Sequence, residues 1–478
     1  MLTNQLNEIL DGLGLLTYEL VLAAGALLVL IIGVLSKKIW LSKVAFTLTL
    51  LVSLWWMPSI SDTIQLFDGS LVLDGLGVVM KWLFSLLAIW IVFFPNSRSH
   101  PPEFYFLILS ILLGSSLMLS ANHLLVVYLV VELTSFSAYI LTNFNFKKQS
   151  FEAGMKYLIF GGISSALALY GASLIYGFTG TLSFGLMDFE LMAQPALLNV
   201  GIILFIGAIL FKVSVVPFHI WVPATYQESP TDAVLILSVI PKIAGFVLLH
   251  RVISLVQIQD TYWLYVLMAV LGSVTVVFGA LGAIRQTNLK RLIAYGAISH
   301  SGYLLAALLV PFEEGVTAFV WYAIIYAIMN LAIFYFISVW EVNGRKELSD
   351  LSGMYISEIL LSVLVIIPII ALIGLPPTAG FTAKFYLFTI LWNWYQEISD
   401  VAILSYLIVL ILTVVVSLFL YLKIPFYIFL KEATAPKIDK SKTSQKILAT
   451  IFSLALLWVF LRPEILNKIA EQINSINW

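Results

Sequence analysis

Apolar segments long enough to cross a membrane recur along this chain, and they decide its fold class. Crossing about 30 Å of hydrocarbon takes about 20 helical residues. Hydrophobic residues make up 61% of the sequence and charged residues 11%, whereas a soluble domain carries about 25% charged residues. Because backbone polar groups in a bilayer must be bonded within the protein, these segments predict an all-α polytopic membrane protein. About fourteen segments qualify, at 17–35, 40–57, 72–94, 104–121, 122–142, 152–177, 196–222, 229–251, 261–283, 290–310, 315–340, 357–392, 401–425 and 446–462.

Basic residues concentrate in every second loop. Loops after odd-numbered segments contain, for example, Lys147, Lys148 and Arg285, whereas loops after even-numbered segments contain Arg251 and little else. Because cytoplasmic loops of membrane proteins are enriched in Lys and Arg, we expect the odd-numbered loops in the cytoplasm and both termini on the outer side. The N-terminus lacks the pattern of a cleavable signal peptide, so the first segment is expected to remain as a span.

Residue types that hold redox centres are scarce. The chain has no cysteine and five histidines, which excludes thiolate-bound iron–sulfur clusters and disulfides. The sequence also lacks a phosphate-binding glycine-rich loop, metal-ligand spacing and a nucleophilic triad. Any redox chemistry would therefore have to be carried by another chain.

Prolines interrupt two of the apolar segments at similar places. The seventh segment contains Pro217 and leads into Pro223, and the twelfth contains Pro376 and Pro377. Each is the fourth segment in a run of five, and two successive units of five crossings have opposite orientations, as in transporters with inverted repeats. Proline is also tolerated in membrane helices without such a role. The expected organisation is an N-terminal three-helix segment, two inverted five-helix repeats that each contain a broken helix, and a cytoplasmic loop with a last span, at 1–103, 104–256, 257–425 and 426–478.

Four ionisable side chains lie deep inside apolar segments: Glu132, Lys212, Lys242 and Lys384. A charge at the bilayer centre costs roughly 2.5–3.5 kcal/mol on insertion scales, so the chain must pair or use these groups. Desolvation favours the neutral form of a lysine, and a nearby carboxylate favours the charged form. Three bases against one acid indicate that some lysines are neutral part of the time, as proton carriers are. Fixed structural pairing is the alternative.

Other polar residues in these segments allow two interpretations. His300 lies mid-segment and could relay protons or simply hydrogen-bond a neighbouring Ser or Tyr. His219 follows the first break and is expected to close it near the cytoplasmic side. Asp74 and Lys81, seven residues apart, are expected to form a local pair on one helix face. Lys156 is expected to reach the membrane interface or to lie beside the midplane acid.

Short motifs occur in a fixed order around the breaks and the midplane residues, at 152–157, 180–182, 211–223, 229–231, 241–244, 289–295, 299–303, 374–381 and 384–388. Together they resemble the antiporter-like membrane subunits of respiratory complex I, NADH-quinone oxidoreductase. A lysine at 384, and no long lateral helix after the last span, suit the subunit N group better than its two larger relatives. Ala224, Glu228 and Ser229 depart from the residues usual in that family.

That resemblance implies a proton channel along the membrane midplane. It implies that Glu132 is the acid that modulates a paired lysine, Lys212. Lys242 would connect the two half-channels. We expect a proton to pass from it through water near His300. Lys384 would end the second half-channel.

The resemblance also implies a function and partners. The expected function is a proton-translocating membrane-arm subunit of NADH:quinone oxidoreductase, driven by quinone reduction in other subunits. The chain itself would hold no cofactor, and partner subunits, among them homologous antiporter-like subunits, would carry the flavin, iron–sulfur clusters and quinone. The expected location is the bacterial inner membrane, without a nucleic-acid partner. The alternatives are a subunit of a multisubunit sodium/proton antiporter and an inert scaffold.

Overall fold

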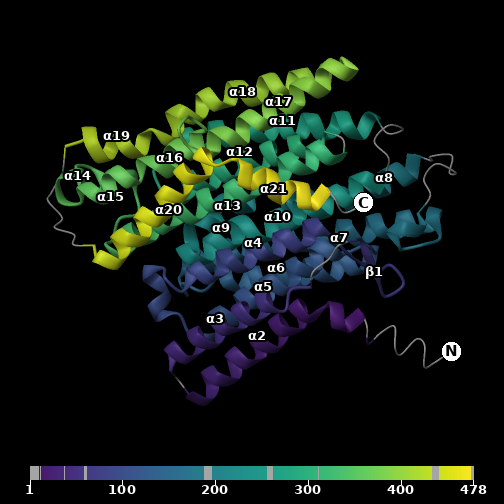
Figure 1. The fold of residues 1–478 in the computed structure, drawn as a ribbon, viewed down its shortest axis with the longest axis horizontal. Helices are drawn as coiled ribbons and strands as arrows, with labels where there is room; N and C mark the ends of the chain where they lie inside the picture. Colours follow the sequence, from purple (N-terminus) through teal and green to yellow (C-terminus); the bar gives the residue numbers. More distant parts are fainter. Residues whose placement is uncertain are drawn as a thin grey trace.

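The computed structural model describes residues 10, 12–36, 38–58, 62–187, 196–255, 262–310, 312–432 and 441–474. Most of them lie in helices that run side by side (Figure 1). The first half contains α2 (Thr17–Ser36), α3 (Ile39–Trp55), α4 (Gly75–Ile91), α5 (Pro102–Ser120), α6 (Leu124–Thr142), α7 (Lys148–Thr179), α8 (Ala196–Lys212), α9 (Trp221–Glu228) and α10 (Thr231–Leu255). The second half contains α11 (Tyr262–Ile284), α12 (Leu289–Leu308), α13 (Phe312–Val342), α14 (Met354–Ser357), α15 (Ile359–Leu364), α16 (Ile366–Ile373), α17 (Ala379–Ile398), α18 (Val401–Tyr421), α19 (Lys423–Leu430), α20 (Thr443–Leu461) and α21 (Glu464–Asn474).

The predicted all-α membrane fold is confirmed. Each of the fourteen predicted segments overlaps a helix, and nine helices in the described part of the chain are long and apolar enough to cross a membrane. Helix α21, which follows the last predicted span, was not expected. Both chain ends, predicted on the outer side, lie outside the described residues.

The third predicted segment begins as a strand rather than as a helix. Strands β1 (Ile64–Leu66) and β2 (Leu71–Leu73) form an antiparallel hairpin, and Phe67, Asp68 and Gly69 in its turn have positive φ. Helix α4 starts only at Gly75, because the Asp74 side chain accepts a hydrogen bond of 2.7 Å from the Gly77 N–H. An aspartate in this position satisfies one of the free amides at a helix start.

Both predicted helix breaks are present. Helix α8 ends at Lys212 and α9 begins at Trp221, while α16 ends at Ile373 and α17 begins at Ala379. Each break contains a cis proline bond, at Pro217 and at Pro377. Pro223 was expected to mark the first break, but it lies in the first turn of α9, where proline is tolerated because that amide has no helical partner.

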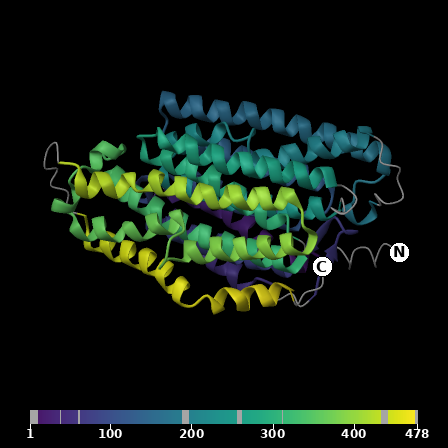
Figure 2. The ribbon, with the colours of Figure 1, turned by 90° about the horizontal axis from the view of Figure 1, so that it is seen from above.

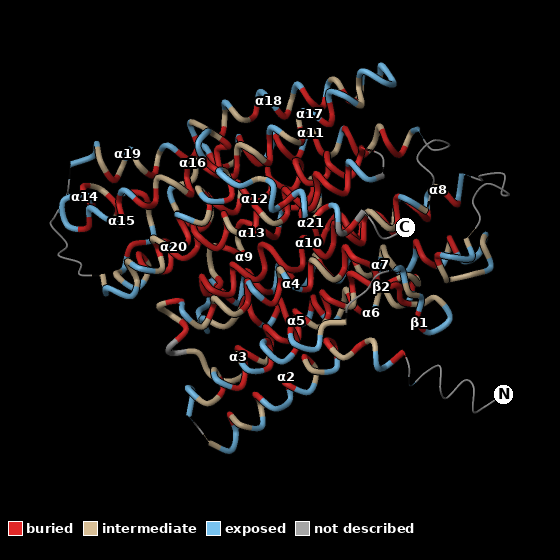
Figure 3. The backbone as a smooth tube through the Cα atoms, in the orientation of Figure 1, coloured by how far each residue is buried: buried red, intermediate tan, exposed pale blue. Residues whose placement is uncertain are grey.

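Helices α10 and α13 form the centre of the bundle. In their apolar windows, 94% and 89% of the residues are buried, against 33% for α2 and 28% for α20. Figure 3 shows the same contrast between the buried centre and the exposed outer helices. The view from above places α20 and α21 along one outer side of the bundle (Figure 2). Helix α5 packs on α6 and α10, and α11 packs correspondingly on α12 and α18, which is the pattern expected for the two repeats.

The N-terminal segment is fastened by ion pairs other than the one expected. Lys81 on α4 pairs with Glu19 on α2 at 2.7 Å, and their side chains are 2% and 5% exposed. Asp74 pairs instead with Arg251 at the end of α10. The expected local pair between Asp74 and Lys81 is therefore wrong, because each has a partner on a neighbouring helix.

Removing one member of the Lys81–Glu19 pair should destabilise the protein strongly. Glu19→Gln leaves the Lys81 ammonium buried without a counter-charge, and the expected loss in the free energy of unfolding is about 3–5 kcal/mol. Unfolding of the full chain in mixed micelles, followed by circular dichroism, measures it. The double variant Glu19→Leu with Lys81→Met should recover most of the loss. Equal losses in the single and double variants would contradict this account.

Candidate functional site

The predicted midplane lysines are all buried, and each lies on a different helix. Lys212 at the end of α8, Lys242 on α10 and Lys384 on α17 are exposed by only 2%, 1% and 3%. Glu132 on α6 is half-buried. A lysine in such a position needs hydrogen-bond acceptors from the protein, because the hydrocarbon around the bundle offers none.

Lys212 reaches the Glu132 helix through a serine. Its Nζ donates to Ser135 Oγ at 2.9 Å, and Ser135 in turn donates to the Val131 carbonyl at 2.6 Å. Glu132 accepts a hydrogen bond from Ser165 on α7. Lys212 and Glu132 interact electrostatically, but in the described part of the chain they form no direct ion pair. The acid and the first lysine are thus neighbours with separate hydrogen-bond partners.

A glycine brings Lys212 close to the helix of Lys242. A Cβ at Gly245 would lie 2.8 Å from Val213 Cγ1 and 3.7 Å from both Cβ and Cγ of Lys212. Gly245 follows Lys242 by three residues on α10, so the two positions are one helical turn apart. The end of α8 therefore packs directly on the turn that carries the second lysine.

Helix α12 connects the second and third lysines. Lys242 Nζ donates to the Ala297 carbonyl at 3.0 Å, and Ser301 donates to the same carbonyl at 3.1 Å. His300, buried on the same helix, has its Nδ1 2.7 Å from the Tyr322 hydroxyl on α13. The imidazole lies within electrostatic range of both Lys242 and Lys384. His300 therefore lies near both lysines and also has the tyrosine partner of the structural interpretation.

The second helix break supplies the acceptors for Lys384. Its Nζ donates to the carbonyls of Leu372 and Ile373, at 3.2 and 2.8 Å, and lies 4.7 Å from the centre of the Tyr303 ring. These carbonyls lack helical partners because α16 ends at Ile373. Gly374, with φ of 89°, leaves room for the Lys384 side chain.

Small cavities lie at both ends of the row formed by Glu132, Lys212, Lys242, His300 and Lys384. One of ≈ 20 Å³ is lined by Glu132, Ser164 and Ser165, among others. Another of ≈ 10 Å³ is lined by His300, Lys384 and Tyr421, together with Ser299 and Ser417. The smaller cavity is about the size that admits one water molecule, and its polar lining suits one.

The remaining predicted residues lie apart from the row. His219 packs its ring edge-to-face on Phe278 of α11, with 4.4 Å between ring centres. Across the first break, Trp221 Nε1 donates to the Phe211 carbonyl at 3.2 Å. Lys156 is exposed on α7. Among the described residues no group of three or more His, Cys, Asp or Glu side chains could hold a metal ion.

Residues 121–424 of the chain match the protein family described as "NADH:quinone oxidoreductase/Mrp antiporter, TM". NADH-quinone oxidoreductase subunit N of Pelagibacter ubique is 33% identical, over 98% of this chain and 100% of that protein. The chain belongs to the subunit N family. The subunit N of Parvibaculum lavamentivorans is 32% identical over 93% of both chains. The predicted resemblance is therefore confirmed.

Solved structures share the fold of this chain. A chain of respiratory complex I from Thermus thermophilus with bound aureothin has a TM-score of 0.76 and 27% identity, over 94% of this chain and 98% of that chain. A chain of an archaeal membrane-bound sulfane sulfur reductase shares the fold, with a TM-score of 0.87 at 24% identity and 97% coverage of both. The chain is thus a multi-pass membrane protein with an antiporter-like fold.

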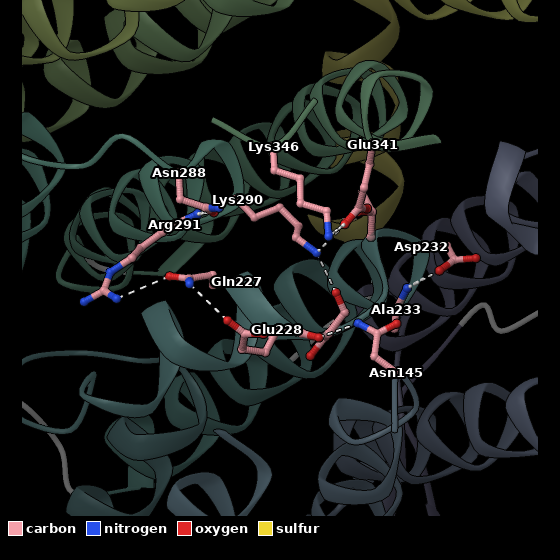
Figure 4. Close-up of polar contacts among 12 residues, drawn as sticks. Asn145, Gln227, Glu228, Asp232, Ala233, Asn288, Lys290, Arg291, Glu341 and Lys346 are labelled. Atoms are coloured by element: carbon pink, nitrogen blue, oxygen red, sulfur yellow. Dashed lines mark hydrogen bonds and ion pairs between the residues drawn. The ribbon is translucent and has the colours of Figure 1, made fainter. Parts of the chain in front are cut away.

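A polar cluster at the α9–α10 junction was not anticipated. Lys290 on α12 contacts Glu341 on α13 at 3.1 Å and donates to the Ser229 carbonyl at 2.8 Å. Thr231 also donates to Glu341. Figure 4 shows the Lys290 side chain of α12 directed toward Glu341 of α13. No partner for Lys290 could be inferred from the sequence, because Glu341 lies 51 residues further along the chain.

Two further contact residues of the row, Ser135 and Tyr303, could have been found from their spacing in the sequence. Ser135 follows Glu132 by three residues, so the two share a helix face. Tyr303 likewise follows His300 by three residues. Small polar or aromatic residues one turn from a buried ionisable group are candidates for its partners.

Adding a methyl group at Gly374 should displace Lys384. A Cβ there would lie 2.5 Å from Lys384 Cδ, so Gly374→Ala adds overpacking of about 1–3 kcal/mol to the cost of a positive φ. Gly344 is the matched control, since it also has positive φ (77°) but nothing within 4 Å of an added Cβ. Unfolding in detergent should therefore show a clearly larger loss for Gly374→Ala than for Gly344→Ala. Equal losses would contradict the close packing of Lys384.

Proposed function

We propose that this chain is a proton-translocating subunit in the membrane arm of NADH:quinone oxidoreductase. The observation that carries the proposal is the row of ionisable groups Glu132, Lys212, Lys242, His300 and Lys384, in which Glu132 is half-buried and the other four are buried, each with a polar partner. An inert scaffold would not need three buried lysines, because each one costs free energy that an apolar side chain avoids.

The relay would work by changing which lysine carries a proton. Glu132 favours the charged form of Lys212, and a charge displacement in neighbouring subunits that weakened this interaction would favour release of the proton. The proton would pass to Lys242 on the adjoining helix turn and then, by way of His300 and water, to Lys384. Two protein carbonyls at the second break would hold it there until release.

The same proposal covers orientation, partners and domains. The charge bias of the loops supports cytoplasmic odd-numbered loops and outward termini, and the bacterial subunit N relatives support a location in the bacterial inner membrane. The two repeats, 104–256 and 257–425, would each form a half-channel with its own broken helix. Redox energy would come from partner subunits that hold the flavin, the iron–sulfur clusters and the quinone site, since the cysteine-free chain offers no thiolate for a cluster.

A charge-conserving substitution of Lys242 tests whether this lysine transfers protons or serves only as a fixed structural charge. Arginine keeps the positive charge but does not release its proton at physiological pH. Lys242→Arg should therefore lower proton pumping and NADH oxidation by the complex in proteoliposomes about tenfold or more, as Lys242→Met should. Lys148→Gln, which removes an exposed lysine at the start of α7, is the control and should leave both rates unchanged.

Full activity of the Lys242→Arg complex would contradict the relay and favour a fixed structural charge. Assembly of the variant complex is checked by its flavin and iron–sulfur content. Loss of that content would show a folding defect, and Lys384→Arg then provides a second test of the same kind.

The alternative function is a subunit of a sodium/proton antiporter. The molecules that co-purify with the chain distinguish it from a subunit of NADH:quinone oxidoreductase. Gentle extraction of the tagged chain from native membranes should yield a complex with flavin and iron–sulfur absorbance and NADH-driven quinone reduction. A colourless complex that exchanges sodium for protons would favour the antiporter. A single half-buried acid in the row favours protons, because sodium binding calls for several oxygen ligands.

A further inference from the structure

A groove runs along the outside of α11, away from the ionisable row. It has a volume of about 910 Å³, within the size range of ligand sites in proteins. Its wall is mostly apolar and is formed by Val274, Val277, Phe278 and Leu281 of α11, with Val409 of α18. The α11 side chains are 36–54% exposed. Because α11 is a membrane-spanning helix, this wall faces hydrocarbon.

One end of the groove is basic. Arg285 and Gln286 line it, and the Lys423 ammonium donates to the carbonyl of Ile284, another lining residue. Within the described ranges, neither Arg285 nor Lys423 has a carboxylate partner. This end belongs to the loops predicted to be cytoplasmic, and Arg285 directly follows the last residue of the spanning helix α11, where such a helix is expected to leave the hydrocarbon. Two cations without an acid at that depth attract an anionic headgroup.

We propose that this groove binds an anionic phospholipid, with an acyl chain along the apolar wall of α11 and the phosphate held by Arg285 and Lys423. The apolar wall and the basic end match the two parts of one amphipathic ligand. A free phosphate ion would use only the basic end. An apolar helix from a partner subunit would leave the two cations without counter-charges.

The groove lies beside the first helix break. The Val216 N–H at the break donates to Thr275 Oγ1 on α11 at 3.0 Å, and Phe278, which lines the groove, also packs on His219. A lipid on this wall would therefore support the helix that holds the break around Lys212. The proposal concerns lipid binding alone and does not depend on the proposed proton pathway.

Lipid titration of the purified full-length chain tests the proposal. Native mass spectrometry counts bound phosphatidylglycerol and, separately, phosphatidylcholine as each is added to the detergent-solubilised protein. The wild type should bind phosphatidylglycerol more tightly. The double variant Arg285→Gln with Lys423→Gln should weaken phosphatidylglycerol binding about tenfold or more and leave phosphatidylcholine binding nearly unchanged. Lys148→Gln removes an exposed cation from the same predicted side and should change neither.

A second variant addresses the apolar wall without altering charge. Val277→Trp fills the groove and should reduce binding of both lipids, while a melting temperature close to that of the wild type shows that the chain remains folded. The proposal is overturned if the wild type binds both lipids equally, or if Lys148→Gln loses as much phosphatidylglycerol as the double variant. Displacement of the lipid by millimolar inorganic phosphate would overturn it too, because the site would then be for a simple anion.

Discussion

An ammonium group inside a bilayer needs hydrogen-bond acceptors from the protein, because the surrounding hydrocarbon offers none. This constraint accounts for much of the interior of the chain. Lys384 takes the two carbonyls left free where α16 ends, and Lys212 takes a serine hydroxyl on α6. Lys242, on a continuous stretch of α10, shares a carbonyl of α12 with Ser301. The three lysine ammonium groups thus find their hydrogen-bond acceptors in three different kinds of local structure.

Close helix packing brings the lysines to their hydrogen-bond acceptors. Gly245 lets the end of α8 approach α10, and Gly374 provides space for the Lys384 side chain. Both residues lie beside a lysine and would clash if they carried a Cβ. The most enclosed helices, α10 and α13, lie at the centre of the bundle, so the row is shielded from lipid over most of its length. Half-buried Glu132 is the exception among its charged members.

Much of this could be predicted from the sequence, because hydropathy and charge bias are local signals. The spans, the two breaks and the buried positions of the midplane lysines follow from them. Partner choice does not, since it depends on which helices become neighbours. Lys81 lies seven residues from Asp74 yet pairs with Glu19, 62 residues earlier, and Asp74 pairs with Arg251 across the bundle. The position of Pro223 within a new helix also required the structure, since proline suits both a break and a first helical turn.

The acid of the row lies at one end only. Helix α6 carries Glu132, whereas its counterpart in the second repeat, α12, carries His300 and no carboxylate. In the first half, the Glu132 carboxylate would attract a proton electrostatically. In the second half, only neutral polar groups would be available to hold one. In the proposed relay, the two halves would therefore bind a proton with unequal strength, more strongly beside Glu132 than beside His300.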